Sequence, residues 1–346
     1  MQQPTQALTR LAAACATALL LAATPAQAQD KPVTFRFSSW VPAQHPLNPS
    51  LVAWGESMKK ASGGTLGATM FPAQQLGKAF DHYDMARDGI ADFAYVNPGY
   101  QPGRFPVFAA SSLPFLIANG KGGSAAVDAW YRNYAAKEMK DVKFCFAFVH
   151  DPGTFHSRKK IVLPTDIKGM KIRPAHEGIG RMVTLLGGTN VQSSAPEVRE
   201  IIGRGVADAV TFPWGSIPLF GIDKVVKYHM DVPLYVTPFV WVMNQGKYNA
   251  LSTAQKKVVD DHCTTEWAEK VASQWADFEY AGHAKLGAMP DHEVYKLTSD
   301  QLDAWRKAVA PVEAEWAKDL KDKTGQDPKA VLDGLKQQLV KYKASM

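Results

Sequence analysis

Two stretches of the chain share one pattern, and this internal likeness constrains the fold more than any other feature of the sequence. Residues 85–95 read MARDGIADFAY, and residues 201–211, which lie 116 positions later (201 minus 85), read IIGRGVADAVT. Each stretch closes a helix-like run with a glycine, the residue that favours the left-handed end of a helix, and then enters an apolar strand through Ala-Asp. A period of this length is too long for a solenoid repeat. It predicts two similar α/β lobes, with a chance likeness between two common junctions as the alternative.

Short strands and helices alternate through the first two thirds of the chain. Residues 33–40 and 142–149 have the pattern of strands, and residues 50–62 have that of an amphipathic helix. This alternation predicts an α/β architecture with largely parallel strands.

The last third is expected to be helical. Ser252 and Gln255 form a capping box, and no proline or glycine follows before Gly282. One helix of about thirty residues would be about 45 Å long, enough to brace both lobes. Thr298 and Gln301 open a further helix in the same way.

The first 28 residues have the features of a cleaved secretory signal. Arg10 precedes an apolar run from Leu11 to Ala23, and Ala26-Gln27-Ala28 has the small-x-small form of a cleavage site. About thirteen apolar residues are too few to span a bilayer. A membrane anchor is the alternative, but secretion is the expectation.

Composition excludes several classes of protein. The chain of 346 residues is 46% hydrophobic with nine tryptophans, which predicts a large core. Its net charge of +6 is spread without a basic block, so no nucleic-acid partner is expected. The sequence holds no cofactor motif, nucleophile elbow or metal-ligand spacing, so we expect no cofactor, no metal and no catalysis. Cys145 and Cys263 remain after the signal, either as one disulfide or as two buried thiols.

Arg173 is the strongest candidate for a ligand-binding residue. It follows the short apolar strand Met170–Ile172, and Pro174 stops the strand directly after it. Ligands of open α/β sheets bind at the carboxyl ends of strands, and a guanidinium matches a carboxylate with two hydrogen bonds. A surface arginine is the alternative reading of the motif alone.

The order and spacing of these motifs resemble those of the periplasmic solute-binding protein of a tripartite ATP-independent periplasmic (TRAP) transporter, of the DctP type. The resemblance covers nearly all of the chain after the signal. It rests on Gln74–Gly77, Asp88–Asp92, Leu163–Arg173, Gly205–Ala209 and the long helix that begins near Leu251.

The resemblance implies a two-lobed periplasmic binding protein with crossing hinge strands. The first lobe would comprise residues 29–152 plus about 240–280, and the second residues 153–239 plus about 281–346. The cleft would hold an organic acid, with its carboxylate on Arg173, and would close by hinge motion. The partners would be the small and large membrane subunits of the transporter, and the protein would be a periplasmic monomer.

Departures from the family pattern indicate the ligand class. Residues 153–156 hold no second arginine, although Arg158 lies close by, and Phe212 stands where sialic-acid-binding relatives have asparagine. Aromatic residues, at the expected strand ends, would suit an aromatic or branched hydrophobic monocarboxylate, including 2-oxo and 2-hydroxy acids. Core packing is the alternative role for each aromatic, and most of all for Phe71, Tyr100 and Phe239. The expected ligand-binding residues are Arg173, Trp40, Gln75, Tyr95, Asn97, Phe155, Phe212, Trp214, Phe239, His45 and His156.

Three other functions stay open at this point. A C4-dicarboxylate or another small organic acid would need a further cationic contact. A periplasmic enzyme would use His156 or His150 as a base. A receptor for another secondary or ATP-driven transporter would share the same cleft.

Overall fold

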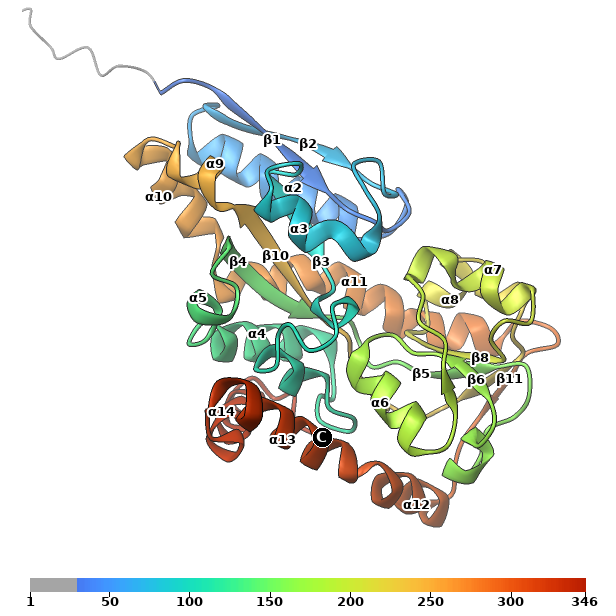
Figure 1. Ribbon diagram of the computed structural model, residues 1–346. Coiled ribbons are helices and arrows are strands. Elements are labelled where there is room, and N and C mark those ends of the chain that lie inside the picture. Colours follow the sequence, from blue (N-terminus) through green and yellow to red (C-terminus); the bar gives the residue numbers. More distant parts are fainter. Residues whose placement is uncertain (1–29) are drawn as a thin grey trace, which may run out of the picture. The chain divides into compact units, whose positions relative to one another are not determined.

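The computed structural model describes residues 30–346, so the expected signal at residues 1–28 lies outside the described residues. Residues 33–346 form one compact unit. This unit contains two β-sheets flanked by helices (Figure 1). The mixed α/β class expected from the sequence is confirmed.

The first sheet has five strands in the order β2-β1-β3-β10-β4. The order joins distant segments of the chain, because β10 inserts between strands that precede it by about a hundred residues or more. The bounds are β1 Val33–Ser38, β2 Leu66–Phe71, β3 Phe93–Val96, β4 Val142–Val149 and β10 Pro238–Asn244. The accompanying helices are α2 Leu47–Ala61, α3 His82–Arg87, α4 Gly120–Tyr131, α5 Ala135–Glu138 and α9 Gln245–Asn249.

The second sheet has six strands in the order β11-β9-β5-β8-β6-β7. All but the edge strand β11 come from the chain between β4 and β10. The bounds are β5 Thr154–Ser157, β6 Lys171–Arg173, β7 Thr189–Asn190, β8 Ala209–Phe212, β9 Tyr228–Met230 and β11 Glu293–Tyr295. The helices of this part are α6 Glu177–Leu185, α7 Val198–Gly203 and α8 Ser216–Leu219.

Both sheets are mixed, but in each sheet of the described residues one strand alone opposes the direction of the others. The expectation of largely parallel strands is therefore confirmed, with β10 and β5 as the exceptions. β10 runs antiparallel to β3 and β4, and β5 runs antiparallel to β8 and β9. The reason is that the chain leaves the first sheet along β4, enters the second along β5 and returns along β10. Each crossing reverses one strand relative to its neighbours.

The internal likeness reflects a real structural repeat. α3 ends ahead of Gly89 (φ 76°) and leads into β3, whereas α7 ends ahead of Gly205 (φ 71°) and leads into β8. The aspartates of the two motifs also play the same part. Asp92 Oδ2 accepts from the Arg36 N–H on the neighbouring parallel strand, and Asp208 Oδ2 accepts from the Lys171 N–H.

The single long helix expected from residue 252 to residue 282 is two helices. α10 spans Thr253–His262 and α11 spans Thr265–Gly287. Cys263 leaves the helical conformation (φ −98°, ψ 66°), and Thr264 restarts it by accepting from the Trp267 N–H. Cys263 also forms a disulfide with Cys145 of β4, with an S–S distance of 2.01 Å, which resolves the open question about these two cysteines. The capping box of Ser252 and Gln255 is confirmed.

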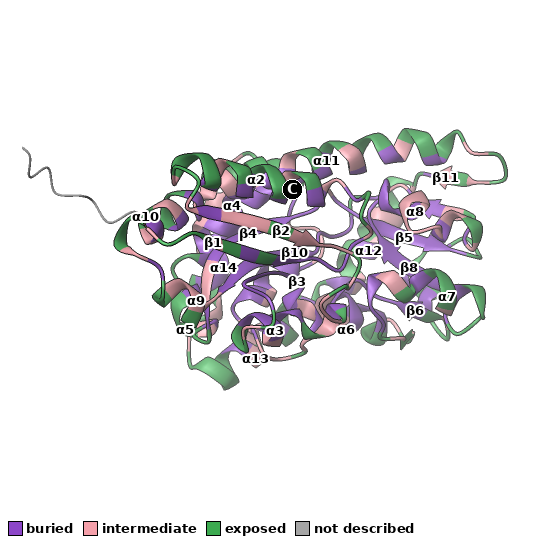
Figure 2. Ribbon diagram, turned by 90° about the horizontal axis from the view of Figure 1, so that it is seen from above, coloured by how far each residue is buried: buried purple, intermediate pink, exposed green. Residues whose placement is uncertain are grey.

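α11 nevertheless spans both halves of the unit. Its 23 residues give a length of about 34 Å. It contacts α2 and α4 beside the first sheet, and α8 and β11 beside the second. Figure 2 shows this helix running alongside both sheets.

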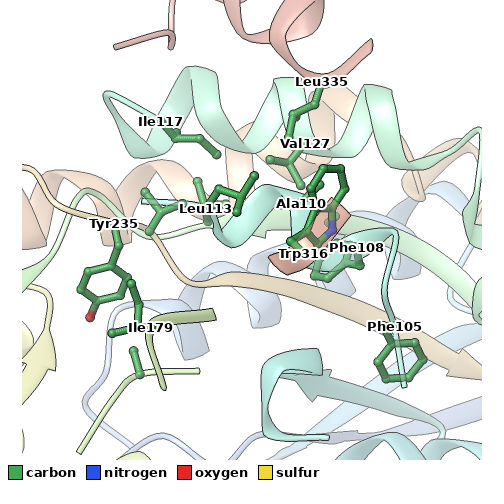
Figure 3. Packing of buried hydrophobic residues seen from close by; sticks show 14 of the residues in the cluster. Phe105, Phe108, Ala110, Leu113, Ile117, Val127, Ile179, Tyr235, Trp316 and Leu335 are labelled. Atoms are coloured by element: carbon green, nitrogen blue, oxygen red, sulfur yellow. The ribbon is translucent and has the colours of Figure 1, made fainter. Parts of the chain in front are cut away.

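Three helices close the chain: α12 Ser299–Val309, α13 Pro311–Thr324 and α14 Pro328–Lys341. α14 packs on α4, where Trp130 Nε1 donates to the Val331 carbonyl at 3.0 Å. Apolar side chains of α4, α13 and α14 share one buried cluster, including Val127, Trp316 and Leu335 (Figure 3). The lobe boundaries given above stay a prediction. Among residues 30–346, no helix is both long enough and apolar enough to cross a membrane.

Candidate functional site

A buried cavity lies between the ends of the two sheets. Its walls come from the carboxyl ends of parallel strands: Trp40 follows β1, Asn97 follows β3, Arg173 ends β6 and Phe212 ends β8. This is the position at which open α/β sheets bind ligands. The other lining residues are Val41, His45, Tyr100, His150, Ala175, Ala195, Pro213, Ser216, Phe220, Tyr235, Thr237, Phe239 and Trp275.

The cavity is narrow. The space between its lining atoms measures about 360 Å³, including its opening to solvent. This space is suited to a small molecule.

Arg173 brings a buried positive charge to the cavity. Its side chain is 1% exposed. Nε donates to the Ser193 carbonyl at 3.0 Å, and Nη2 donates to the Tyr100 hydroxyl at 2.9 Å. Within residues 30–346 no carboxylate forms an ion pair with this guanidinium, and both of its hydrogen-bond partners are neutral. Buried charges are normally paired, so the site favours the binding of an anionic group beside Arg173.

The histidines of the cavity carry no charge near neutral pH. Burial lowers the pKa of His45 to about 3 and that of His150 to about 4. His150 Nε2 accepts from the Thr237 N–H at 3.0 Å, so the proton lies on Nδ1, which donates to the Asp151 carbonyl at 2.6 Å. His45 Nδ1 accepts from the Leu47 N–H at 3.2 Å. Arg173 is thus the one cation among the described residues that line the cavity.

Aromatic rings form most of the remaining wall. Trp40 stacks on Tyr95, with centroids 4.8 Å apart and planes inclined by 18°. Phe239 lies 5.3 Å from Trp275, and Phe212 lies 5.3 Å from Phe220 in an edge-to-face arrangement. Such walls favour a ligand with an apolar, ring-shaped body.

The structure brings six of the eleven expected ligand-binding residues to this cavity. They are Arg173, Trp40, Asn97, Phe212, Phe239 and His45. Asn97 uses its amide locally: Nδ2 donates to the Ala175 carbonyl and Oδ1 accepts from the Gly99 N–H.

The other five lie elsewhere. Tyr95 is buried behind Trp40, and Gln75 is exposed. Phe155 packs on Trp305 of α12, because neighbouring residues of a strand face opposite sides of a sheet. His156 Nε2 donates to the Phe212 carbonyl at 3.0 Å from behind the wall, and the ring of Trp214 lies 4.4 Å from that of His283.

Several lining residues were not among the expected ones. Tyr235 and Thr237 come from the loop before β10, and Trp275 comes from α11. Ser216 begins α8, and Phe220 directly follows that helix. Tyr100 also lines the cavity. Its sequence position did indicate a place near the site, because it closely follows the apolar run of β3.

A wider groove lies next to the cavity and shares Tyr100 with it. It encloses about 860 Å³. Its cation Arg181 is already paired with Glu177 and Asp319, so the groove offers no unpaired charge to an acid. No group of three or more His, Cys, Asp or Glu side chains within residues 30–346 could hold a metal ion.

Comparison with known proteins agrees with this fold and site. The model of the family "bacterial extracellular solute-binding protein, family 7" matches residues 37–319. The chain therefore belongs to this family of transport proteins, and the expected kinship with TRAP solute-binding proteins is confirmed.

Three solved TRAP solute-binding proteins are similar over 90% of this chain. One from a marine metagenome, in complex with 3-hydroxybenzoate, is 32% identical, with a TM-score of 0.84 and 99% of its length covered. One from Rhodoferax ferrireducens, with copurified benzoate, is 27% identical (TM-score 0.84, 98% covered). One from Bordetella bronchiseptica, with bound (R)- and (S)-mandelate, is 27% identical (TM-score 0.83, 99% covered).

Proposed function

We propose that this protein captures an aromatic monocarboxylate in the cavity between its sheets and delivers it to the membrane subunits of a TRAP transporter in the periplasm. The observation that carries the proposal is the buried guanidinium of Arg173, which has only neutral hydrogen-bond partners. An incoming carboxylate supplies the missing negative charge through a charge-assisted hydrogen bond.

The cavity walls support a ring behind that carboxylate. Trp40, Phe212, Phe239 and Trp275 present apolar faces within a narrow space. The three relatives described above were solved with single-ring aromatic acids. Both facts favour the same ligand class.

A dicarboxylate finds less support. A second carboxylate needs a second cation, and His45 and His150 are neutral because burial lowers their pKa values to about 3 and about 4. Arg158 does not supply the charge, since its guanidinium donates to the Ile202 carbonyl away from the cavity.

Catalysis by histidine also finds little support. Both ring nitrogens of His150 and of His156 are engaged in hydrogen bonds within the fold. Burial lowers the pKa of His156 to about 3, far from the value near the working pH that a general base needs.

The periplasmic location rests on two observations. The sequence of residues 1–28 predicts a secretory signal, and the Cys145–Cys263 disulfide fits an oxidising compartment.

Calorimetric titration of Arg173→Ala with benzoate, 3-hydroxybenzoate and mandelate tests the proposal. Removing one partner of a buried charge pair weakens binding by about 2–5 kcal/mol, so affinity should fall at least about thirtyfold. Arg158→Ala is the matched control and should bind like the wild type. Equal affinity of Arg173→Ala and wild type would refute the assignment, and binding of succinate in preference to the aromatic acids would refute the ligand class.

A further inference from the structure

Two hydrogen-bond donors on the cavity wall have no acceptor among residues 30–346. They are the indole Nε1–H of Trp40, whose side chain is 4% exposed, and the hydroxyl of Tyr235, which is 1% exposed. A buried donor without a partner costs about 1–3 kcal/mol. Both residues line the same cavity as Arg173.

Among residues 30–346, no acceptor forms a hydrogen bond with the Trp40 indole. The ring is stacked on Tyr95, and Tyr100 and Phe239 lie 6.0 and 6.3 Å from its centroid. An indole nitrogen can donate but cannot accept. A group that enters the cavity, which Trp40 lines, can supply the acceptor.

Tyr235, which lies in the loop before β10, is likewise held at the cavity wall by neighbouring rings. Its ring meets His150 and His176 edge to face, at 5.6 and 5.5 Å. Figure 3 shows its hydroxyl pointing away from the apolar side chains around Leu113 and Ile117. The nearby Thr211 hydroxyl accepts from the Ala175 N–H and faces Tyr235 as a donor, so it does not serve as the acceptor for the Tyr235 O–H.

The hydroxyl of Tyr235 keeps its proton. Burial raises the pKa of this phenol far above neutral pH. Tyr235 can therefore act as a donor, like Trp40, and both call for an acceptor on the ligand.

From this pair we infer that the ligand carries an oxygen beyond its carboxylate, as a hydroxyl or keto group, and that Trp40 and Tyr235 select for it. The inference rests on the proposed function, because Arg173 has to hold the carboxylate first. An acid without the extra oxygen offers the two donors only the carboxylate that Arg173 already engages, and sites built to bind a polar group discriminate strongly against analogues that lack it.

The test compares acids that differ only in that oxygen. Phenylacetate is paired with mandelate and with phenylglyoxylate, and benzoate is paired with 3-hydroxybenzoate. Calorimetry on the wild-type protein should give at least one oxygenated acid an affinity about tenfold higher than that of its parent, since a neutral hydrogen bond contributes about 0.5–1.5 kcal/mol.

Trp40→Phe and Tyr235→Phe each remove one donor and keep a ring in place. In at least one of them the tenfold preference should fall below about threefold, because the affinity for the oxygenated acid falls more than the affinity for its parent acid. The matched controls are Trp241→Phe and Tyr95→Phe. These two side chains are also buried with unpartnered donor atoms, but they do not line the cavity, so the preference should persist.

Thermal unfolding of each variant establishes that it is folded. Equal affinity for oxygenated and parent acids in the wild type would overturn the inference and leave the proposed function intact. A preference that survives in both cavity variants, or parallel losses for all the acids, would also overturn it. If none of the acids binds to the wild type, the proposed function falls, and this inference falls with it.

Discussion

Acidification to pH 5 should bring this protein close to unfolding, because it buries an unusual number of neutral histidines. Burial lowers the pKa of six of them from 6.5 to values between about 2 and about 4. They are His45, His82, His150, His156, His176 and His229. Two of them, His156 and His229, lie in a hydrogen-bonded row with His292: His156 Nδ1 and His229 Nδ1 are 2.7 Å apart, and His229 Nε2 and His292 Nδ1 are 2.8 Å apart.

The sign of the effect follows from linkage. A histidine whose pKa is lowered on folding contributes stability above pH 6.5, and this stability is lost as the pH falls toward its folded-state pKa. At pH 5, which is about 1.5 units below 6.5, each histidine has lost about 2 kcal/mol, and six have lost about 12 kcal/mol.

One buried carboxylate opposes this loss. Glu279 on α11 is fully buried, and it accepts from the Ser216 N–H at 2.9 Å and from Trp275 Nε1 at 2.6 Å. Burial raises its pKa from 4.5 to about 7, so it contributes more stability as the pH falls from 7 toward 4.5 and returns about 2 kcal/mol at pH 5. Burial raises the pKa of Asp128, Glu138 and Asp151 as well, which acts in the same direction. The net loss is at most about 10 kcal/mol, comparable to the entire stability of a typical protein.

Guanidinium chloride unfolding, followed by tryptophan fluorescence between pH 7.5 and 5, measures this loss. His82→Asn should reduce the pH slope by about one proton, or about 1.4 kcal/mol per pH unit. Ser38→Ala removes the hydroxyl that lies 3.0 Å from His82 Nε2, so it should lower stability and leave the slope unchanged. A free energy of unfolding that changes by less than about 3 kcal/mol over this range would refute the reasoning.

Two further predictions concern covalent and steric restraints. The Cys145–Cys263 disulfide closes a loop of 118 residues, and its removal in a Cys145→Ala/Cys263→Ala variant should lower the free energy of unfolding by about 5 kcal/mol in denaturant titrations; an unchanged midpoint would contradict this. Gly282 on α11 leaves no room for a side chain, since a Cβ there would lie 2.1 Å from Gly215 N. Gly282→Ala should lower stability by about 3 kcal/mol, whereas Gly287→Ala on the same helix, where the nearest atom is 3.5 Å away, should not; similar melting temperatures for the two variants would argue against the close contact.

The sequence predicted those parts of the fold that depend on local signals. The repeated helix-glycine-strand junctions at Gly89 and Gly205 follow from the conformational freedom of glycine. The sequence also predicted that Arg173 ends a strand, because Pro174 follows the short apolar run and lacks the N–H that would continue the strand. The capping boxes at Ser252 and Thr298 also marked true helix starts.

The parts that were not predicted depend on contacts between distant segments. The break of the helix at Cys263 combines a local signal that the sequence reading missed, the capping Thr264, with a distant contact, the disulfide to β4. The antiparallel direction of β10 follows from the route of the chain and not from its residues. Aromatic residues at strand ends could not be divided between the cavity and the core without knowing which way each strand faces, as Phe155 and Phe212 illustrate.

The position of β10 between β3 and β4 has a consequence for the order in which the chain can fold. The first sheet is left at Val149 and rejoined at Pro238, 89 positions later (238 minus 149). During synthesis from the N-terminus, β4 has no strand of the first sheet to pair with until β10 is made, because β4 lies at the edge of the sheet described here and β10 is its neighbour. Five strands of the second sheet can already pair during that interval. The pairing of β4 with β10 joins segments that are far apart in the sequence, and such contacts slow folding. The backbone amides of the inserted segment should therefore become protected from hydrogen exchange before those of β4.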